Sequence, residues 1–150
     1  MIVGGGVGGC AAALAAAASD LRVILTEESD WIGGQLTSQA TPPDEHGWIE
    51  SFGCTRSYRR MRNAVREYYK TFYPLTEKAR NNPYLNPGDG WVSPLCAEPK
   101  VFLAVLGNFL AQWIQKGNLR ILTEHIPIAA DTEKTKVRAV SLKTYETAKP

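Results

Sequence analysis

The sequence predicts an α/β fold built around a parallel β-sheet, and three observations support this prediction. The first 27 residues follow the order strand, glycine turn, small-residue helix, strand, which is how a parallel βαβ unit begins. A strongly periodic helix at 100–116 leads directly into a short apolar segment that can add a third strand. Two further strand-like segments flank a polar turn near the end and predict a β-hairpin.

The first βαβ unit is assigned from its composition. We expect a strand at Ile2-Val3, a turn at Gly4–Gly9, a helix at Cys10–Ser19 and a second strand at Arg22–Thr26. Alanine dominates the helix and has the highest helix propensity of all residues. The apolar stretch Val7–Ala18 is too short to span a bilayer, and no basic residue precedes it. We therefore expect neither a membrane span nor a signal peptide.

The turn matches the dinucleotide-binding pattern G-x-G-x-x-G at Gly4, Gly6 and Gly9. In this pattern the first glycine permits a tight turn, the second lets the backbone approach a pyrophosphate, and the third lets the helix pack on the strand. The free N–H groups and the positive end of the helix then face the phosphates. The flanking strand and helix favour a Rossmann-type nucleotide site over a flexible glycine loop.

A carboxylate follows the second strand at the place where such sites bind ribose. Glu27 lies 18 residues after Gly9, close to the spacing at which a carboxylate accepts hydrogen bonds from the ribose hydroxyls. Its charge disfavours a phosphorylated ribose and hence NADP. Glu28 fits a solvated neighbour better. The alternative is that both glutamates are surface charges after a strand.

The middle of the chain reads as loop, helix and loop. Residues 28–55 and 81–98 are rich in glycine and proline and lack periodicity. Residues 56–73 form a helix that Pro74 ends, with basic residues on its other faces. Its apolar stripe consists of Tyr58, Met61, Val65, Tyr69 and Phe72.

The helix at 100–116 is the best defined in the sequence, because apolar pairs recur every four residues from Val101 to Ile114. Gly117-Asn118 supplies its stop. Short strands are expected at Leu119–Leu122, Ile126–Ala130 and Lys136–Leu142, the last two flanking a turn at Asp131–Thr135.

A second glycine motif carries a resemblance to a known superfamily. Gly33-Gly34 follows Glu27 by six residues, as in flavoproteins with two dinucleotide-binding domains. The segments Thr26–Gln39, Pro42–His46 and Phe52–Thr55 extend this, and the chain resembles bacterial FAD-dependent oxidoreductases over nearly its whole length.

The resemblance implies an FAD-binding Rossmann domain with the strand order 3-2-1. It implies that Gly33 and Gly34 pass the FAD pyrophosphate and lead toward the flavin. It also implies a backbone contact to adenine at Ile126, a residue that reads equally well as an ordinary strand position. The complete enzyme is expected to transfer hydride between FAD and a small organic substrate.

Two departures from the superfamily pattern lead us to expect the N-terminal part of a larger enzyme. Only Met1, Ile2 and Val3 precede the glycines, and the superfamily's C-terminal glycine-aspartate segment and substrate domain have no counterpart. We expect a partial FAD-binding domain over 1–150, made of an ADP-binding core at 1–34, an insertion at 35–98, and a helix, third strand and hairpin at 99–150. We expect the 150-residue chain alone to retain little FAD and to be inactive.

Catalytic residues are poorly marked. His46 lies in a loop expected to run near the flavin, where a neutral imidazole could remove a substrate proton; the alternative is a loop-stabilising histidine. Cys54 and Cys96 could form a redox pair, although buried structural cysteines are commoner. No Cys-x-x-Cys pair is present, so we expect no metal site and a reducing, cytoplasmic location.

Charge suggests one alternative function. The net charge of +2 is too small to imply a polyanionic partner, but residues 56–80 carry eight basic and two acidic side chains. The helix Arg56–Lys70 could therefore be a nucleic-acid-binding module. A buried stripe beneath a solvated basic face explains the pattern more simply. A flavin-less, non-catalytic remnant is a further alternative. We expect a small-molecule substrate as the partner, without nucleic acid or membrane, and infer no oligomeric state.

Overall fold

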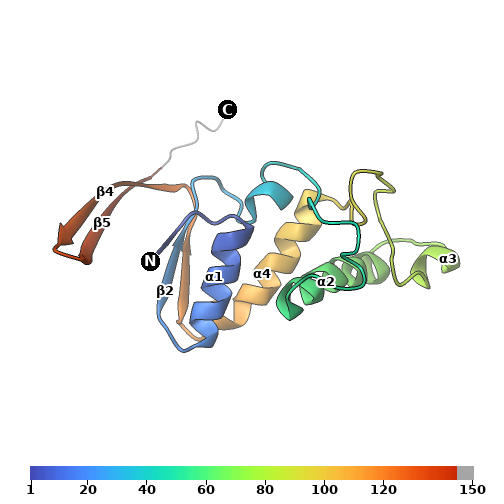
Figure 1. Cartoon of the computed structure of the whole chain (residues 1–150), viewed down its shortest axis with the longest axis horizontal. Helices are drawn as coiled ribbons and strands as arrows, with labels where there is room; N and C mark the ends of the chain where they lie inside the picture. Colours follow the sequence, from blue (N-terminus) through green and yellow to red (C-terminus); the bar gives the residue numbers. More distant parts are fainter. Residues whose placement is uncertain (145–150) are drawn as a thin grey trace. The chain divides into compact units, whose positions relative to one another are not determined.

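The computed structural model describes residues 1–144 and contains a parallel three-stranded sheet, formed by two strands near the start of the chain and one from residues 119–122 (Figure 1). Its strands are β1 (Ile2–Val3), β2 (Val23–Thr26) and β3 (Leu119–Leu122), in the order β1-β2-β3. Val3 pairs with Thr26, and Thr26 pairs with Leu122. The carboxyl ends of the strands therefore lie at one level, and the predicted α/β fold with its three parallel strands is confirmed.

Helix α1 (Val7–Ala18) connects β1 to β2 and packs against both. Cys10, Ala13 and Ala17 are buried along it, and these small side chains allow the helix to approach the sheet closely. The helix begins at Val7, three residues before the predicted start at Cys10. Glycine is a poor helix former, but packing against the sheet outweighs that propensity at residues 8 and 9.

The described part of the chain ends in an antiparallel hairpin of β4 (His125–Glu133) and β5 (Lys136–Thr144). The predicted hairpin is correct, but the strands are longer than expected and the reversal is confined to Lys134-Thr135. Lys134 adopts a positive φ of 54°, which suits the tight reversal. Most of the hairpin is exposed, including the apolar side chains of Ile128 and Val137.

The chain divides into two compact units. The first contains Met1–Gly34 and the chain from Phe109 onward, and the second is Gln35–Asn108. Helix α4 (Pro99–Gln115) begins in the second unit and continues into the first. The sequence-based division at 34/35 and 98/99 stays a prediction about domain organisation.

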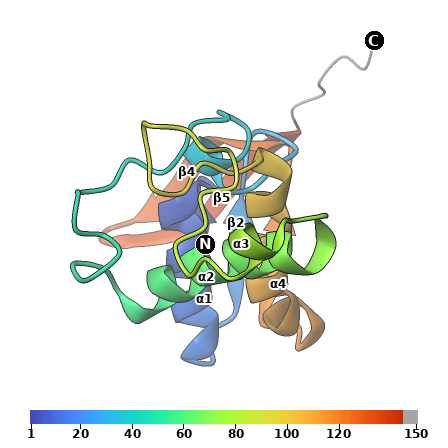
Figure 2. The same ribbon diagram turned by 90° about the vertical axis from the view of Figure 1, so that its right-hand side faces the viewer.

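The second unit contains two complete helices, the first part of α4, and long loops at 37–55 and 81–98 (Figure 2). Helix α2 (Arg56–Phe72) starts at Thr55, whose hydroxyl accepts a hydrogen bond from the Tyr58 amide at 3.2 Å. The short helix α3 (Glu77–Arg80) was not expected from periodicity and begins in the same way at Thr76. A 3₁₀ turn, η1 (Gly34–Leu36), interrupts the expected loop. Buried apolar side chains of this unit include Met61, Val65, Tyr69, Leu85, Leu95, Val101 and Phe102.

None of the helices within residues 1–144 is both long enough and apolar enough to cross a membrane.

Candidate nucleotide-binding site

The glycine turn between β1 and α1 is locked by a close backbone approach. Gly4 has a φ of +91°, a conformation that side-chain-bearing residues rarely adopt. A Cβ at Gly9 would lie 1.9 Å from the carbonyl oxygen of Gly4, so no side chain fits there. The first and third glycines of the motif therefore serve the tight turn and the helix packing that the sequence predicted for them.

The N-terminus of α1 can receive an anion. Gly6 precedes the helix in extended conformation, and the first intrahelical bond runs from the Cys10 amide to the Gly6 carbonyl at 2.9 Å. The amides of Val7, Gly8 and Gly9 precede that bond and have no acceptor one turn back. A Cβ placed at Gly6 meets no atom within 4 Å among the described residues, so a ligand can reach the backbone there. These features fit a pyrophosphate at the positive end of the helix.

Glu27 is held in one orientation at the end of β2. It is buried, and its Oε2 accepts a hydrogen bond from the Gly5 amide at 2.9 Å. Its Oε1 accepts from the amide and the hydroxyl of Ser29, at 2.9 and 2.8 Å. A carboxylate offers about four acceptor positions, so one remains for a ribose hydroxyl. The exposed Glu28 agrees with its predicted role as a solvated neighbour.

Gly5 and Ser29 were not singled out from the sequence, although both orient Glu27. A Cβ at Gly5 would lie 2.8 Å from Cβ of Glu27 and 2.9 Å from its Oε2. Only glycine therefore allows the carboxylate to fold onto the turn. The available signal was the glycine at position 5, which the G-x-G-x-x-G pattern does not require, and a serine two residues after Glu27. That serine spacing favours local side-chain to backbone bonds.

The second glycine pair lies beside the phosphate turn. The Gly33 amide donates to the Gly5 carbonyl at 2.7 Å, and Gly33 forms an isolated parallel bridge with Gly6. A Cβ at Gly34 would lie 3.1 Å from the Gly6 Cα. The structure thus brings together Gly4, Gly6, Gly9, Glu27, Gly33 and Gly34.

Ile126 lies one residue beyond this cluster. The His125 amide donates to the Glu27 carbonyl at 2.9 Å, which joins the start of β4 to the acidic end of β2. Ile126 itself pairs with Lys143 in the hairpin. Its assignment as a backbone contact to adenine stays a prediction.

Cys10 serves the architecture of the turn. Its thiol donates to the Gly5 carbonyl at 3.2 Å, and its side chain is buried. Burial, and then the negative charge of Glu27, raise the pKa of this thiol to about 11. The thiol therefore stays protonated near neutral pH and is a poor nucleophile.

His46 belongs to the second unit, where both of its ring nitrogens contact the surrounding loop. Nδ1 accepts from the Trp48 amide at 3.2 Å, and Nε2 lies 3.4 Å from the Gly53 carbonyl oxygen. The rings of Trp48 and Phe52 lie about 6 Å from the imidazole. This arrangement is that of a loop-stabilising histidine, and its catalytic assignment stays a prediction.

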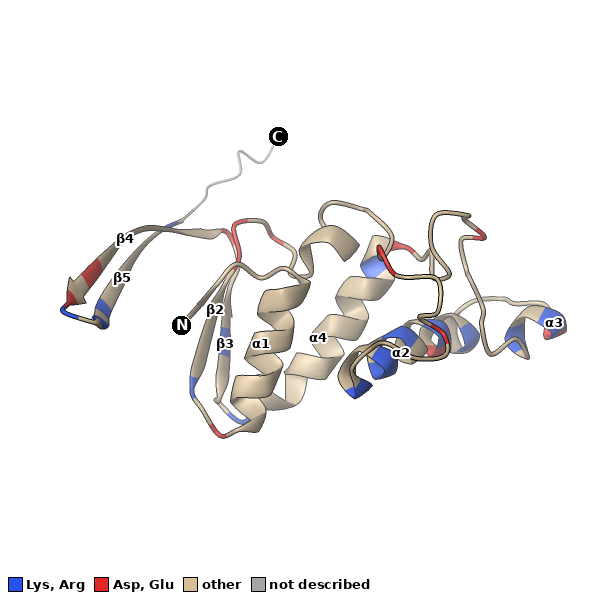
Figure 3. Cartoon of the chain, in the orientation of Figure 1, with Lys and Arg blue, Asp and Glu red and all other residues tan. Residues whose placement is uncertain are grey.

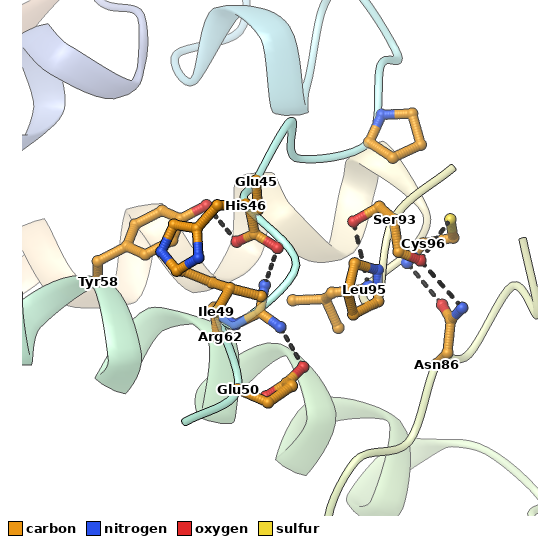
Figure 4. Close-up of polar contacts among 12 residues, drawn as sticks. Glu45, His46, Ile49, Glu50, Tyr58, Arg62, Asn86, Ser93, Leu95 and Cys96 are labelled. Carbon is orange, nitrogen blue, oxygen red and sulfur yellow. Dashed lines mark hydrogen bonds and ion pairs between the residues drawn. The ribbon is translucent and has the colours of Figure 1, made fainter. Parts of the chain in front are cut away.

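The basic helix differs from the expected solvated face. Basic residues gather along α2 (Figure 3), but the side chains of Arg62 and Arg66 are only 0% and 3% exposed. Arg62 pairs with Glu45 and Glu50 (Figure 4), and Arg66 contacts Glu50 at 2.5 Å. Phe72, assigned to the buried stripe, is exposed instead. The arginines turn inward because the acidic loop before α2 supplies their partners.

The described residues contain no group of three or more histidine, cysteine, aspartate or glutamate side chains that could hold a metal ion. Over the same part of the chain, Cys10, Cys54 and Cys96 are free. The suggested pairing of Cys54 with Cys96 stays a prediction.

Comparisons with known proteins agree with this geometry. The model of the family described as "FAD dependent oxidoreductase" matches residues 1–149. An L-amino acid oxidase from Cerastes cerastes is 38% identical over 83 residues, which are 55% of this chain and 16% of that protein. The chain therefore spans only about a sixth of the length of this curated relative. No solved structure matches the chain.

Proposed function

The chain belongs to the FAD dependent oxidoreductase family, and we propose that residues 1–34 bind the ADP half of FAD in an enzyme that transfers hydride between the flavin and a small organic substrate. The observation that carries the proposal is the joined geometry of the phosphate turn and Glu27. The Gly5 amide fixes the carboxylate beside the open helix terminus, as a bound dinucleotide requires. The resemblance to bacterial members in particular remains part of this proposal.

The residues present fit FAD in charge and in shape. The open N-terminal amides of α1 and the space above Gly6 suit the pyrophosphate, and the remaining acceptor position of Glu27 suits an unphosphorylated ribose. The Gly33-Gly34 segment lies against the turn, where it would guide the cofactor past the phosphates. Ile126 would contribute a backbone contact to the adenine.

The cofactor supplies the redox chemistry when bound, because its flavin ring accepts or donates a hydride. The chain contributes orientation. Glu27 fixes the ribose, the helix terminus neutralises phosphate charge, and the buried Cys10 thiol remains protonated beside them. For His46 to serve as a base, its bond to the Trp48 amide must first break. We therefore propose a loop-stabilising role for His46 before a catalytic one.

The substrate class is open to direct assay. The relative's name describes an oxidase of L-amino acids, so amino acids are the first compounds to test with this protein.

We also propose residues 35–98 as an insertion in the FAD domain, and a reducing, cytoplasmic location, which the free cysteines support. Nucleic-acid binding by α2 is less well supported, because the side chains of Arg62 and Arg66 are buried in ion pairs and cannot contact phosphates.

Substitution of Gly6 tests the proposed function. In the full-length enzyme, Gly6→Val places a branched side chain in the pyrophosphate path and should abolish flavin retention, measured by visible absorbance after dialysis with FAD. Gly107→Ala is the matched control, because its Cβ also meets no atom within 4 Å of the described residues but lies in α4. A Gly6→Val protein that retains as much flavin as the control would refute the proposal.

A further inference from the structure

An open cleft in the second unit lies outside the residues assigned to FAD. Its volume is about 780 Å³, within the range of roughly 300–1,000 Å³ that is common for small-molecule sites. The end of α2, the short helix α3, the loop 84–89 and the segment 96–98 form its walls. All of these belong to Gln35–Asn108, so the cleft is built within one unit.

Glu98 is held at one wall of this cleft by two tyrosines, Tyr73 through its carboxylate and Tyr69 through its backbone amide. The hydroxyl of Tyr73 donates to Oε1 of Glu98 at 2.9 Å, and the Glu98 amide donates to the hydroxyl of Tyr69 at 2.9 Å. The hydrogen bond to Glu98 is the main reason that the pKa of Tyr73 rises to about 12, so this phenol stays protonated and keeps its orientation. Glu98 directly precedes α4, whose first amides bond its carbonyl, and this fixes its backbone.

The aromatic rings and the charges favour a cation with an apolar body. The rings of Tyr69 and Tyr73 lie 4.4 Å apart at 42°, and Tyr84 adds a third, exposed ring to the lining. Ring faces attract cations. Glu98 and Asp89 contribute two negative charges to the cleft and Lys78 one positive charge, so its net charge is negative. One Glu98 oxygen is partly engaged by Tyr73, which leaves acceptor capacity for an ammonium N–H.

We propose that this cleft binds an organic ammonium ion, a protonated primary amine on an aromatic or aliphatic body, with Glu98 accepting its N–H groups and the tyrosine rings contacting its apolar part. The site is independent of the proposed flavin function, since it uses none of the residues assigned to FAD. A neutral ligand of the same shape keeps the contact with the rings but lacks the charge-assisted hydrogen bond to Glu98.

Calorimetric titration of the full chain tests this proposal with phenethylammonium chloride as the probe and 2-phenylethanol as its neutral analogue. We expect the amine to bind at least about tenfold more tightly than the alcohol, on the scale of one charge-assisted hydrogen bond. Glu98→Gln should lower the affinity for the amine by about tenfold or more, and Tyr73→Phe by several-fold, since it releases the carboxylate. The matched control is Glu77→Gln, because Glu77 is an exposed carboxylate on α3 that does not line the cleft. This substitution should leave the affinity for the amine unchanged.

Equal affinity for the amine and the alcohol would overturn the proposal, as would unchanged binding in Glu98→Gln. An equal loss in Glu77→Gln would also overturn it, because the effect would then come from general surface charge. Far-UV circular dichroism identifies any variant that fails to fold. If Glu98→Gln is unfolded, Tyr73→Phe decides the matter, since it removes one hydroxyl from a half-buried ring, and wild-type amine affinity in that variant would contradict the proposed site.

Discussion

Replacing Gly9 by alanine should separate the packing role of the glycine motif from simple helix propensity. Alanine at position 9 would place its Cβ 1.9 Å from the carbonyl oxygen and 3.0 Å from the carbonyl carbon of Gly4. Both atoms belong to backbone, so no side-chain rotation relieves the clash. The turn and the helix must instead move apart by about 1 Å, which is a typical overpacking distortion.

The magnitude follows from two opposing effects. Overpacking in a well-packed region costs about 1–3 kcal/mol, and a rigid backbone partner places this clash at the upper end. The better helix propensity of alanine returns about 1 kcal/mol. Gly9→Ala should therefore destabilise the protein by about 2 kcal/mol and should also displace the phosphate turn. Gly8→Ala has no atom within 4 Å of its new Cβ among the described residues, so it should stabilise the protein by up to about 1 kcal/mol.

Urea unfolding of the wild type and the two variants checks the comparison. The midpoint should fall for Gly9→Ala and rise or stay level for Gly8→Ala, with equal m-values if the unfolded states are comparable. If both alanines shift the midpoint in the same direction by the same amount, the close approach of Gly4 to Gly9 does not constrain the turn, and the reasoning fails.

Three further substitutions test the remaining parts of the account. Glu27→Gln should weaken FAD binding by about 1–3 kcal/mol, the scale of a charge-assisted hydrogen bond, with Glu28→Gln close to wild type in flavin retention; equal retention by both would place the ribose partner elsewhere. Arg62→Met should cost about 3–5 kcal/mol in urea unfolding because it leaves the buried carboxylate of Glu45 without its cationic partner, whereas Arg56→Met on the exposed start of α2 should stay within about 0.5 kcal/mol. Burial acts to raise the pKa of Glu50, but its arginine partners outweigh burial and the pKa is lowered. This stabilisation is complete above the unfolded-state pKa of glutamate and is lost as pH falls through the lower folded value, so Glu50→Gln should flatten the acid limb of a stability–pH profile, and an unchanged limb would contradict the ion pair.

The sequence predicted the glycine turn and the position of Glu27 because each of these features depends on local constraints. The positive φ at position 4 and the close backbone approach at position 9 allow only glycine, so the glycines in the sequence indicate these conformations. The spacing to Glu27 follows from the length of one helix and one strand. The parallel direction of the strands could be anticipated because a helix connects consecutive strands, whereas their order was implied only by the resemblance to flavoproteins.

The second unit was harder to predict because its structure depends on contacts that are distant in sequence. Arg62 and Arg66 have the spacing of a solvated helix face, and only the placement of Glu45 and Glu50 from the preceding loop turns that face inward. The same applies to Glu98, which contacts a tyrosine 25 residues earlier. Periodicity describes one helix at a time, so the local sequence pattern cannot predict these contacts between distant residues.

The central claim is that the glycine turn and Glu27 bind the ADP half of FAD, and an amide NMR titration of the chain with ADP tests it most directly. Even weak binding moves the resonances of the amides that contact the phosphates. The account predicts saturable shifts at Gly4–Gly9, Glu27 and Gly33, which Gly6→Val should remove. Shifts confined to the arginine amides of α2, or no shifts in the glycine turn at ADP concentrations that saturate ordinary nucleotide sites, would contradict it.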